Sequence, residues 1–186
     1  MLSALGTRAV ARAAVIGAYV LAVEYARALW MRSPGGVLPG LILGGAALGV
    51  AALAFSPQRL GLRASRLPLR IIGGLGLGAV LLLPAAARVG SAPLLPASLA
   101  LAAVIVSVGE EIAFRGALYA ALEEVGGAPA AIAGSTLLWT LAHALSHPPM
   151  FLGAVAAAGL LLALWRWAFK DLVAPVIAHV IADLAL

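Results

Sequence analysis

Long apolar runs, separated by short polar or glycine- and proline-rich breaks, make up almost the whole chain. A membrane-spanning helix needs roughly 20 mostly apolar residues. Clusters such as Ser33–Gly36 and Gly126–Pro129 mark turns between the runs. The pattern predicts helical segments at about Ala9–Trp30, Val37–Phe55, Ile71–Ala87, Leu94–Val108, Ala130–Leu145, Phe151–Phe169 and Leu172–Leu186.

The runs lack the strict alternation expected of membrane β-barrel strands. Composition supports lipid as the surrounding medium, because 64% of the residues are hydrophobic and only 10% are charged. Soluble domains carry about 45–50% apolar and about 25% charged residues. We therefore predict an all-α, polytopic membrane bundle of about six to eight transmembrane helices, forming a single integral membrane domain over residues 1–186.

Positive charge is spread along the chain in short segments between the apolar runs, and the net charge is +5. No basic stripe carries interleaved aromatic residues, so nucleic acid is not an expected partner. The positive-inside rule assigns the basic loop from Arg59 to Arg70 to the cytoplasm, together with the N-terminus. The loops near Pro34, Arg88 and Pro148 then face outward. We expect a multi-pass protein of the plasma (inner) membrane.

Ionisable residues inside the apolar runs are the candidate functional groups, because a charge at membrane depth is costly unless paired or hydrated. The chain has only seven acidic residues and three histidines, and no cysteine. We expect Glu24 and Arg27 to form an ion pair on the surface of the first helix. The other residues of interest lie within or beside apolar helices, and they are Glu110, Glu111, His143, His179 and Asp183.

Helix spacing predicts that some of these groups meet. If the fourth and fifth segments form an antiparallel hairpin, Glu110 and His143 each lie about 15 residues, or roughly 22 Å, from the turn and are therefore level. Glu111 and Arg115 are four residues apart and can form an ion pair along one helix. His179 and Asp183 are also four apart and share one helix face.

A buried carboxylate beside a histidine can activate water as a general base. No serine lies in a nucleophile-elbow pattern, so water is the expected nucleophile. No cofactor is required by this interpretation. A zinc protease is the alternative, with ligands drawn from Glu110, His143, His147 and His179, although no HExxH motif is present.

Three short motifs resemble those of the CPBP (CAAX protease and bacteriocin-processing, or Abi) family. Glu110-Glu111-Ile112-Ala113-Phe114-Arg115 matches the pattern EExxxR. Trp139-Thr140-Leu141-Ala142-His143 is similar to FxxxH, with Trp in place of Phe. His179-Val180-Ile181-Ala182-Asp183 is similar to HxxxN/D, with Asp where CAAX endopeptidases have Asn. The resemblance covers roughly residues 56–186, the expected protease core.

The resemblance implies a glutamate-dependent intramembrane endopeptidase acting on a membrane-associated protein or peptide. It implies that Glu110 is the general base and that His143 helps to hold and activate the water. His179 and Asp183 would stabilise the oxyanion or orient the site. Glu111 and Arg115 would support the site.

Non-enzymatic functions remain alternatives from a different class. A membrane scaffold or immunity protein could retain the fold without the chemistry, and it would tolerate alanine at Glu110. A proton or ion transporter could use the same acidic residues, but the chain shows no inverted repeat of the kind found in many transporters.

Overall fold

The computed structural model describes residues 4–63, 65–83 and 95–185. Within these ranges the chain is helical and contains no strand. The predicted all-α class is therefore confirmed. The helices are α1 (Ala4–Trp30), α2 (Val37–Gly49), α3 (Pro57–Leu60), α4 (Leu67–Leu81), α5 (Ala97–Glu111), α6 (Tyr119–Ala142), α7 (Pro149–Phe169) and α8 (Val173–Ala185), and a π-helix at Ile112–Leu118 joins α5 to α6.

Four helical stretches are long and apolar enough to cross a membrane: Gly6–Trp30, Val37–Ala54, Ala97–Leu145 and Pro149–Phe169. Helices α4 and α8 are apolar but shorter. The stretch Ala97–Leu145 folds back on itself, so the described residues agree with the predicted helical membrane bundle. The ends of the third and fourth predicted segments, and the loop at Arg88, fall within residues 84–94 and lie outside the described residues.

The predicted hairpin between the fourth and fifth segments is confirmed, because the backbone leaves helical geometry at two successive glycines. Gly126 has φ −146° and ψ 24°, and Gly127 has φ 67° and ψ −162°. A positive φ is readily adopted only by glycine. The two arms then pack together, since a Cβ on Gly134 would meet the side chain of Leu122.

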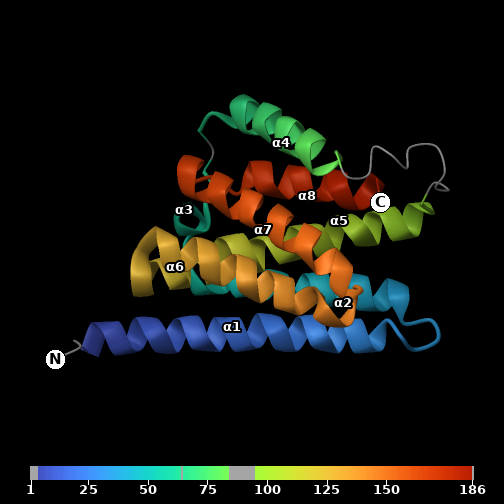
Figure 1. Ribbon diagram of the computed structural model, residues 1–186, viewed down its shortest axis with the longest axis horizontal. Helices are drawn as coiled ribbons and strands as arrows, with labels where there is room; N and C mark the ends of the chain where they lie inside the picture. The colour runs from blue at the N-terminus through green and yellow to red at the C-terminus, as the bar shows by residue number, and fades with distance from the viewer. Residues whose placement is uncertain (1–3, 64, 84–94, 186) are drawn as a thin grey trace.

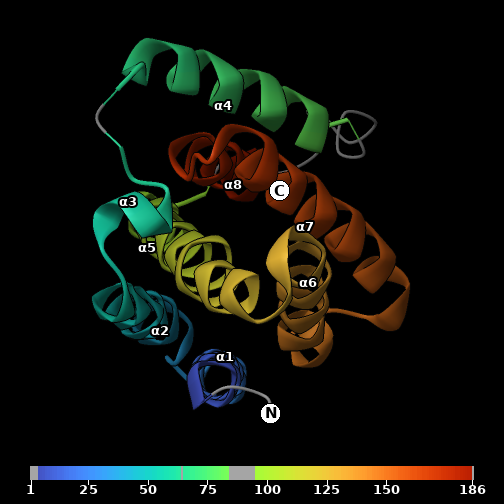
Figure 2. The same cartoon turned by 90° about the vertical axis from the view of Figure 1, so that its left-hand side faces the viewer.

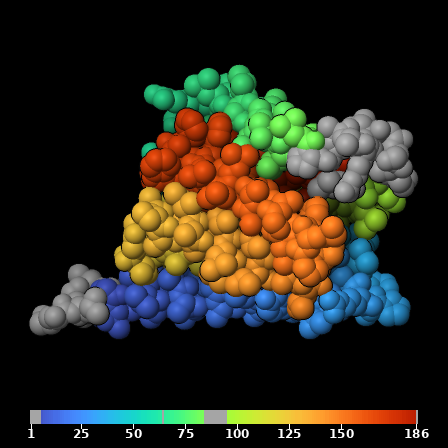
Figure 3. All heavy atoms as spheres, in the orientation of Figure 1, coloured from blue at the N-terminus to red at the C-terminus, as the bar shows by residue number. Residues whose placement is uncertain are grey.

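Helix α5 occupies the middle of the bundle, between α2 and α8, while α4 packs on the outer side of α8 (Figure 2). Figure 3 shows α1 along one edge of the molecule, with α6 packed against it. The approach of α5 to α2 is very close, because a Cβ on Gly109 would overlap the backbone of Gly45. Small residues permit such approaches in membrane bundles, and here the approach positions the residue that follows, Glu110.

Basic residues from separate loops gather at one end of the bundle, as the charge pattern predicts. Arg12 of α1 and Arg59 of α3 both pair with Glu124, at 3.2 and 2.8 Å. Lys170, after α7, pairs with Glu123 at 3.1 Å. The N-terminal end of α1, the basic loop and the turn of the hairpin therefore lie on the same side (Figure 1).

Candidate active site

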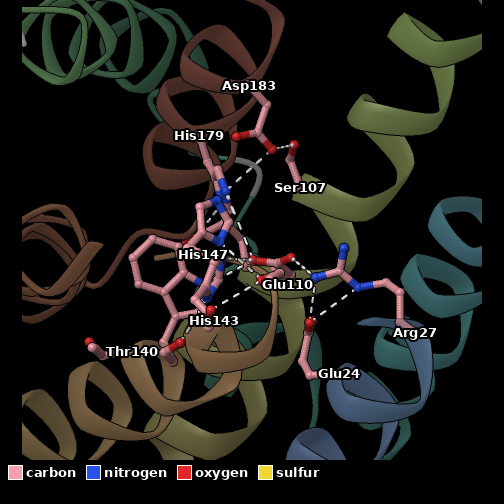
Figure 4. A network of polar contacts seen from close by, with 12 residues as sticks. Glu24, Arg27, Ser107, Glu110, Thr140, His143, His147, His179 and Asp183 are labelled. Atoms are coloured by element: carbon pink, nitrogen blue, oxygen red, sulfur yellow. Dashed lines mark hydrogen bonds and ion pairs between the residues drawn. The ribbon is translucent and has the colours of Figure 1, made fainter. Parts of the chain in front are cut away.

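Glu110, in the last turn of α5, lies at the centre of a cluster of polar side chains (Figure 4). Its side chain is buried, with the residue 3% exposed. Trp139 Nε1–H donates a hydrogen bond of 2.9 Å to Glu110 Oε2. The same oxygen lies 3.7 Å from His143 Nε2 and 4.0 Å from His179 Nε2. The end of α6 and helix α8, which are distant in sequence from α5, therefore present polar groups to one carboxylate oxygen.

His143 begins the short 3-10 turn His143–Leu145 that follows α6. Its Nδ1 lies 2.8 Å from the backbone carbonyl of Trp139. Because a carbonyl can only accept, Nδ1 carries the hydrogen and Nε2 faces Glu110. The predicted level placement of Glu110 and His143 is thus found in the structure. Their separation of 3.7 Å is too long for a direct hydrogen bond.

Glu111 and Arg115 form the predicted ion pair along the helix, with 3.0 Å between Glu111 Oε1 and Arg115 Nη1. Both residues are completely buried. Arg115 lies within the π-helix, a geometry that frequently marks functional sites. Its guanidinium carbon also lies 4.1 Å from the centroid of the Trp139 ring. Arg115 therefore contacts both Glu111 and the indole that donates to Glu110.

His179 of α8 contacts Glu111 of α5. Its Nδ1 lies 2.9 Å from Glu111 Oε1, so Nδ1–H donates to that carboxylate. Its Nε2 lies 3.5 Å from Asp183 Oδ2, which confirms that the two residues share one face of α8. Ser107 of α5 bonds Asp183 Oδ2 at 2.7 Å. The order Glu111, His179, Asp183 forms a continuous polar row beside Glu110.

Arg27 and Glu24 correct one prediction. They do form an ion pair, but it is buried inside the bundle, with Glu24 1% and Arg27 9% exposed. Arg27 Nη2 lies 3.0 Å from Glu110 Oε1, so the pair belongs to the site. The periodicity of α1 could not show this, because apolar residues surround the whole helix. The available signal was the depth of two charges within a long apolar run.

His147 lies beside His143, with 5.2 Å between the ring centroids, and within the described ranges it makes no hydrogen bond or ion pair with Glu110. Its ring stacks on Phe151 with 5.0 Å between centroids, and its Nδ1 lies 3.0 Å from Ser146 Oγ. Partial burial and the neighbouring His143 lower the pKa of His147. Within the described ranges, no three His, Asp or Glu side chains are arranged to hold a metal ion.

One comparison with known proteins identifies the family. The model of the "Type II CAAX prenyl endopeptidase Rce1-like" family matches residues 92–185, which include all three motifs and the helices that carry them. The chain belongs to this family. Membership makes the chain an intramembrane peptidase with a protein substrate, and the family resemblance drawn from the motifs is confirmed. No curated protein and no solved structure matches the chain. Helix α1, which carries Arg27, lies outside the matched residues.

Proposed function

We propose that this peptidase cleaves a membrane-associated protein with a water molecule activated by Glu110, and that it works without a metal. The convergence of Glu110 Oε2 with His143 Nε2 and His179 Nε2, from three different helices in a buried site, is the observation that carries this proposal. Burying ionisable side chains at membrane depth costs free energy. Such side chains are therefore found mainly where they have a function.

In the proposed reaction, a water molecule contacts both Glu110 Oε2 and His143 Nε2 from one side, because the 3.7 Å between these atoms leaves no room between them. Because His143 holds its hydrogen on Nδ1, its Nε2 can accept a hydrogen bond from the water and orient it. Glu110 takes a proton as the water oxygen bonds to the scissile carbonyl carbon. The carbonyl π electrons move to oxygen and produce a tetrahedral oxyanion. Glu110 then returns the proton to the leaving nitrogen as the C–N bond breaks.

His179 is the proposed donor to the oxyanion. Its Nδ1–H is directed to Glu111, and its Nε2 faces the two carboxylates of Glu110 and Asp183. Three surrounding carboxylates favour a protonated ring, whose Nε2–H can stabilise developing negative charge. Asp183, fixed by Ser107, would orient this ring. Glu111 and Arg115 would support the arrangement.

The first test is cleavage by purified, detergent-solubilised protein of a prenylated peptide ending in a CAAX sequence, the substrate class in the family's name. If this peptide is not cleaved, membrane proteins that accumulate uncleaved in cells carrying Glu110→Ala supply the substrate. Glu110→Gln keeps the shape of the side chain and removes the base. We expect it to lower kcat by at least about 100-fold, and His143→Ala to lower it similarly.

Each rival function predicts a different result. A zinc enzyme would lose activity to a chelator and regain it with Zn²⁺, whereas the glutamate mechanism is unaffected by chelation. A scaffold or immunity protein would keep its cellular function with Glu110→Ala. Full activity of folded Glu110→Gln would refute the proposed base.

We also propose that the protein lies in the plasma membrane with its N-terminus in the cytoplasm, because the basic residues gather at that end of the bundle. Two parts of the site, Glu24 and His143, lie nearer the other end, whereas His179 is midway along α8. Glu24 is six residues before the end of α1, or about 9 Å along the axis. His143 directly follows the last residue of α6.

A further inference from the structure

The two oxygens of Glu110 have different surroundings. Oε2 faces His143 and His179, the direction in which the proposed water and substrate lie. Oε1 faces away from the histidines and bonds Arg27 Nη2 of α1 at 3.0 Å. The oxygen that faces away from the histidines is therefore fixed by α1, a helix that the family match does not include.

Arg27 is itself held on several sides. It pairs with Glu24, one turn earlier on α1, through both Nε and Nη2. Its stem packs against Gly44 of α2, where a Cβ would collide with Arg27 Cγ and Cδ. Its Nη1 lies 3.9 Å from the sulfur of Met31. A guanidinium restrained in this way presents a fixed direction to Glu110.

Each of the two adjacent glutamates, Glu110 and Glu111, pairs with a different arginine. Arg115, the arginine of EExxxR, bonds Glu111. Among the ion pairs of the described residues, Arg27 is the arginine that reaches Glu110. An ionised carboxylate buried without a partner is strongly unfavourable. Arg27 therefore compensates the buried negative charge of Glu110, as Arg115 compensates that of Glu111.

Trp139 adds a second restraint, on the other oxygen. The motif has Phe at this position, which has no hydrogen-bond donor, whereas the Trp139 indole donates a hydrogen bond of 2.9 Å to Glu110 Oε2. The indole is fixed in turn, since Arg115 lies over its face and His143 and His179 meet it edge to face. One donor on each oxygen defines the plane of the carboxylate.

We propose that Arg27 and Trp139 are positioning residues that hold Glu110 in the orientation needed to take a proton from water. This inference rests on the proposed role of Glu110. Arg27 fixes Oε1, and Trp139 fixes Oε2 while leaving that oxygen's other lone pair toward the histidines. Glu24 shares the charge of Arg27, so the guanidinium orients the base without fully neutralising it.

The test compares Arg27→Gln, Arg27→Lys and Trp139→Phe in the peptide-cleavage assay, with kcat and KM measured separately. Misplacing a catalytic group by about 1 Å can cost about 100-fold, so we expect Arg27→Gln to lower kcat by about that factor. Lysine keeps the charge and should restore part of the rate. Trp139→Phe removes a hydrogen bond to an ionised carboxylate, so we expect it to lower kcat by roughly tenfold or more. KM should change by less than about threefold in each.

Arg12→Gln is the matched control, because Arg12 also lies on α1 but pairs with Glu124 at the exposed end of the bundle. It should leave kcat unchanged. Trp139→Phe and Arg27→Lys are mild enough to retain the fold if Arg27→Gln does not, and thermal unfolding of every variant verifies this.

Wild-type or higher kcat in folded Arg27→Gln and Trp139→Phe, with Glu110→Gln inactive, would overturn the inference and leave the proposed function intact. A rise in kcat on removing Arg27 would mean that its positive charge weakens Glu110 as a base rather than positioning it. If Glu110→Gln itself retains full activity, the proposed function fails first.

Discussion

Arg115 offers the most direct test of how the structure balances buried charge. It is completely buried, lies 3.0 Å from Glu111, and covers the face of Trp139. Methionine at this position would fill much of the same space without the charge. Among the described residues, the Glu111 carboxylate would then keep His179 as its one polar partner. Removing one member of a buried ion pair costs about 3–5 kcal/mol of unfolding free energy.

For a chain of this length, 1 kcal/mol corresponds to about 2–4 °C in Tm. Arg115→Met should therefore lower Tm by about 6–20 °C. Thermal unfolding of the purified protein in detergent, followed by far-UV circular dichroism, measures this change. Arg59→Met is the control, because its pair with Glu124 is half-exposed and such pairs contribute about 1 kcal/mol or less.

The double variant Arg115→Met/Glu111→Leu removes both charges of the pair and should recover part of the lost stability. The recovery is incomplete because His179 Nδ1–H loses its acceptor. A double-mutant cycle with both single variants gives the coupling energy. The reasoning is refuted if Arg115→Met unfolds within about 2 °C of the unmodified protein. It is refuted equally if the double variant is as unstable as the sum of the single ones.

Three further predictions follow from other parts of the structure. Asp183→Asn should keep kcat within about tenfold of the unmodified protein, because the Asn oxygen can still accept from Ser107 and at most about one hydrogen bond is lost. A drop as large as that of Asp183→Leu would show that the negative charge is needed. Gly109→Ala should lower the unfolding free energy by about 1–3 kcal/mol through overpacking against α2, which the melting assay would contradict by showing no shift. In this cysteine-free chain, a membrane-impermeant thiol reagent added outside intact cells should label cysteine at Ser33 and not at Ser65; the reverse pattern would invert the proposed topology.

The sequence by itself determined the class of the protein and the local part of the site. Apolar runs of about 20 residues require a membrane helix, because lipid offers no partner for backbone polar groups. The pairs Glu111–Arg115 and His179–Asp183 were predictable, since residues four apart meet on one helix face. The glycine turn at Gly126 and equal arm lengths made the approach of Glu110 to His143 predictable as well.

Only the tertiary structure decided which helix faces meet, and with them the remainder of the site. In a chain that is apolar on nearly every helix face, periodicity does not distinguish a lipid-facing side from a buried one. Arg27 was therefore placed on the surface by sequence, although it reaches Glu110 across the bundle. The bonds from Ser107 to Asp183 and from Trp139 to Glu110 likewise join residues 76 and 29 positions apart. Such contacts depend on helix packing, here on the close approach of α2 to α5, which no local pattern in the chain specifies.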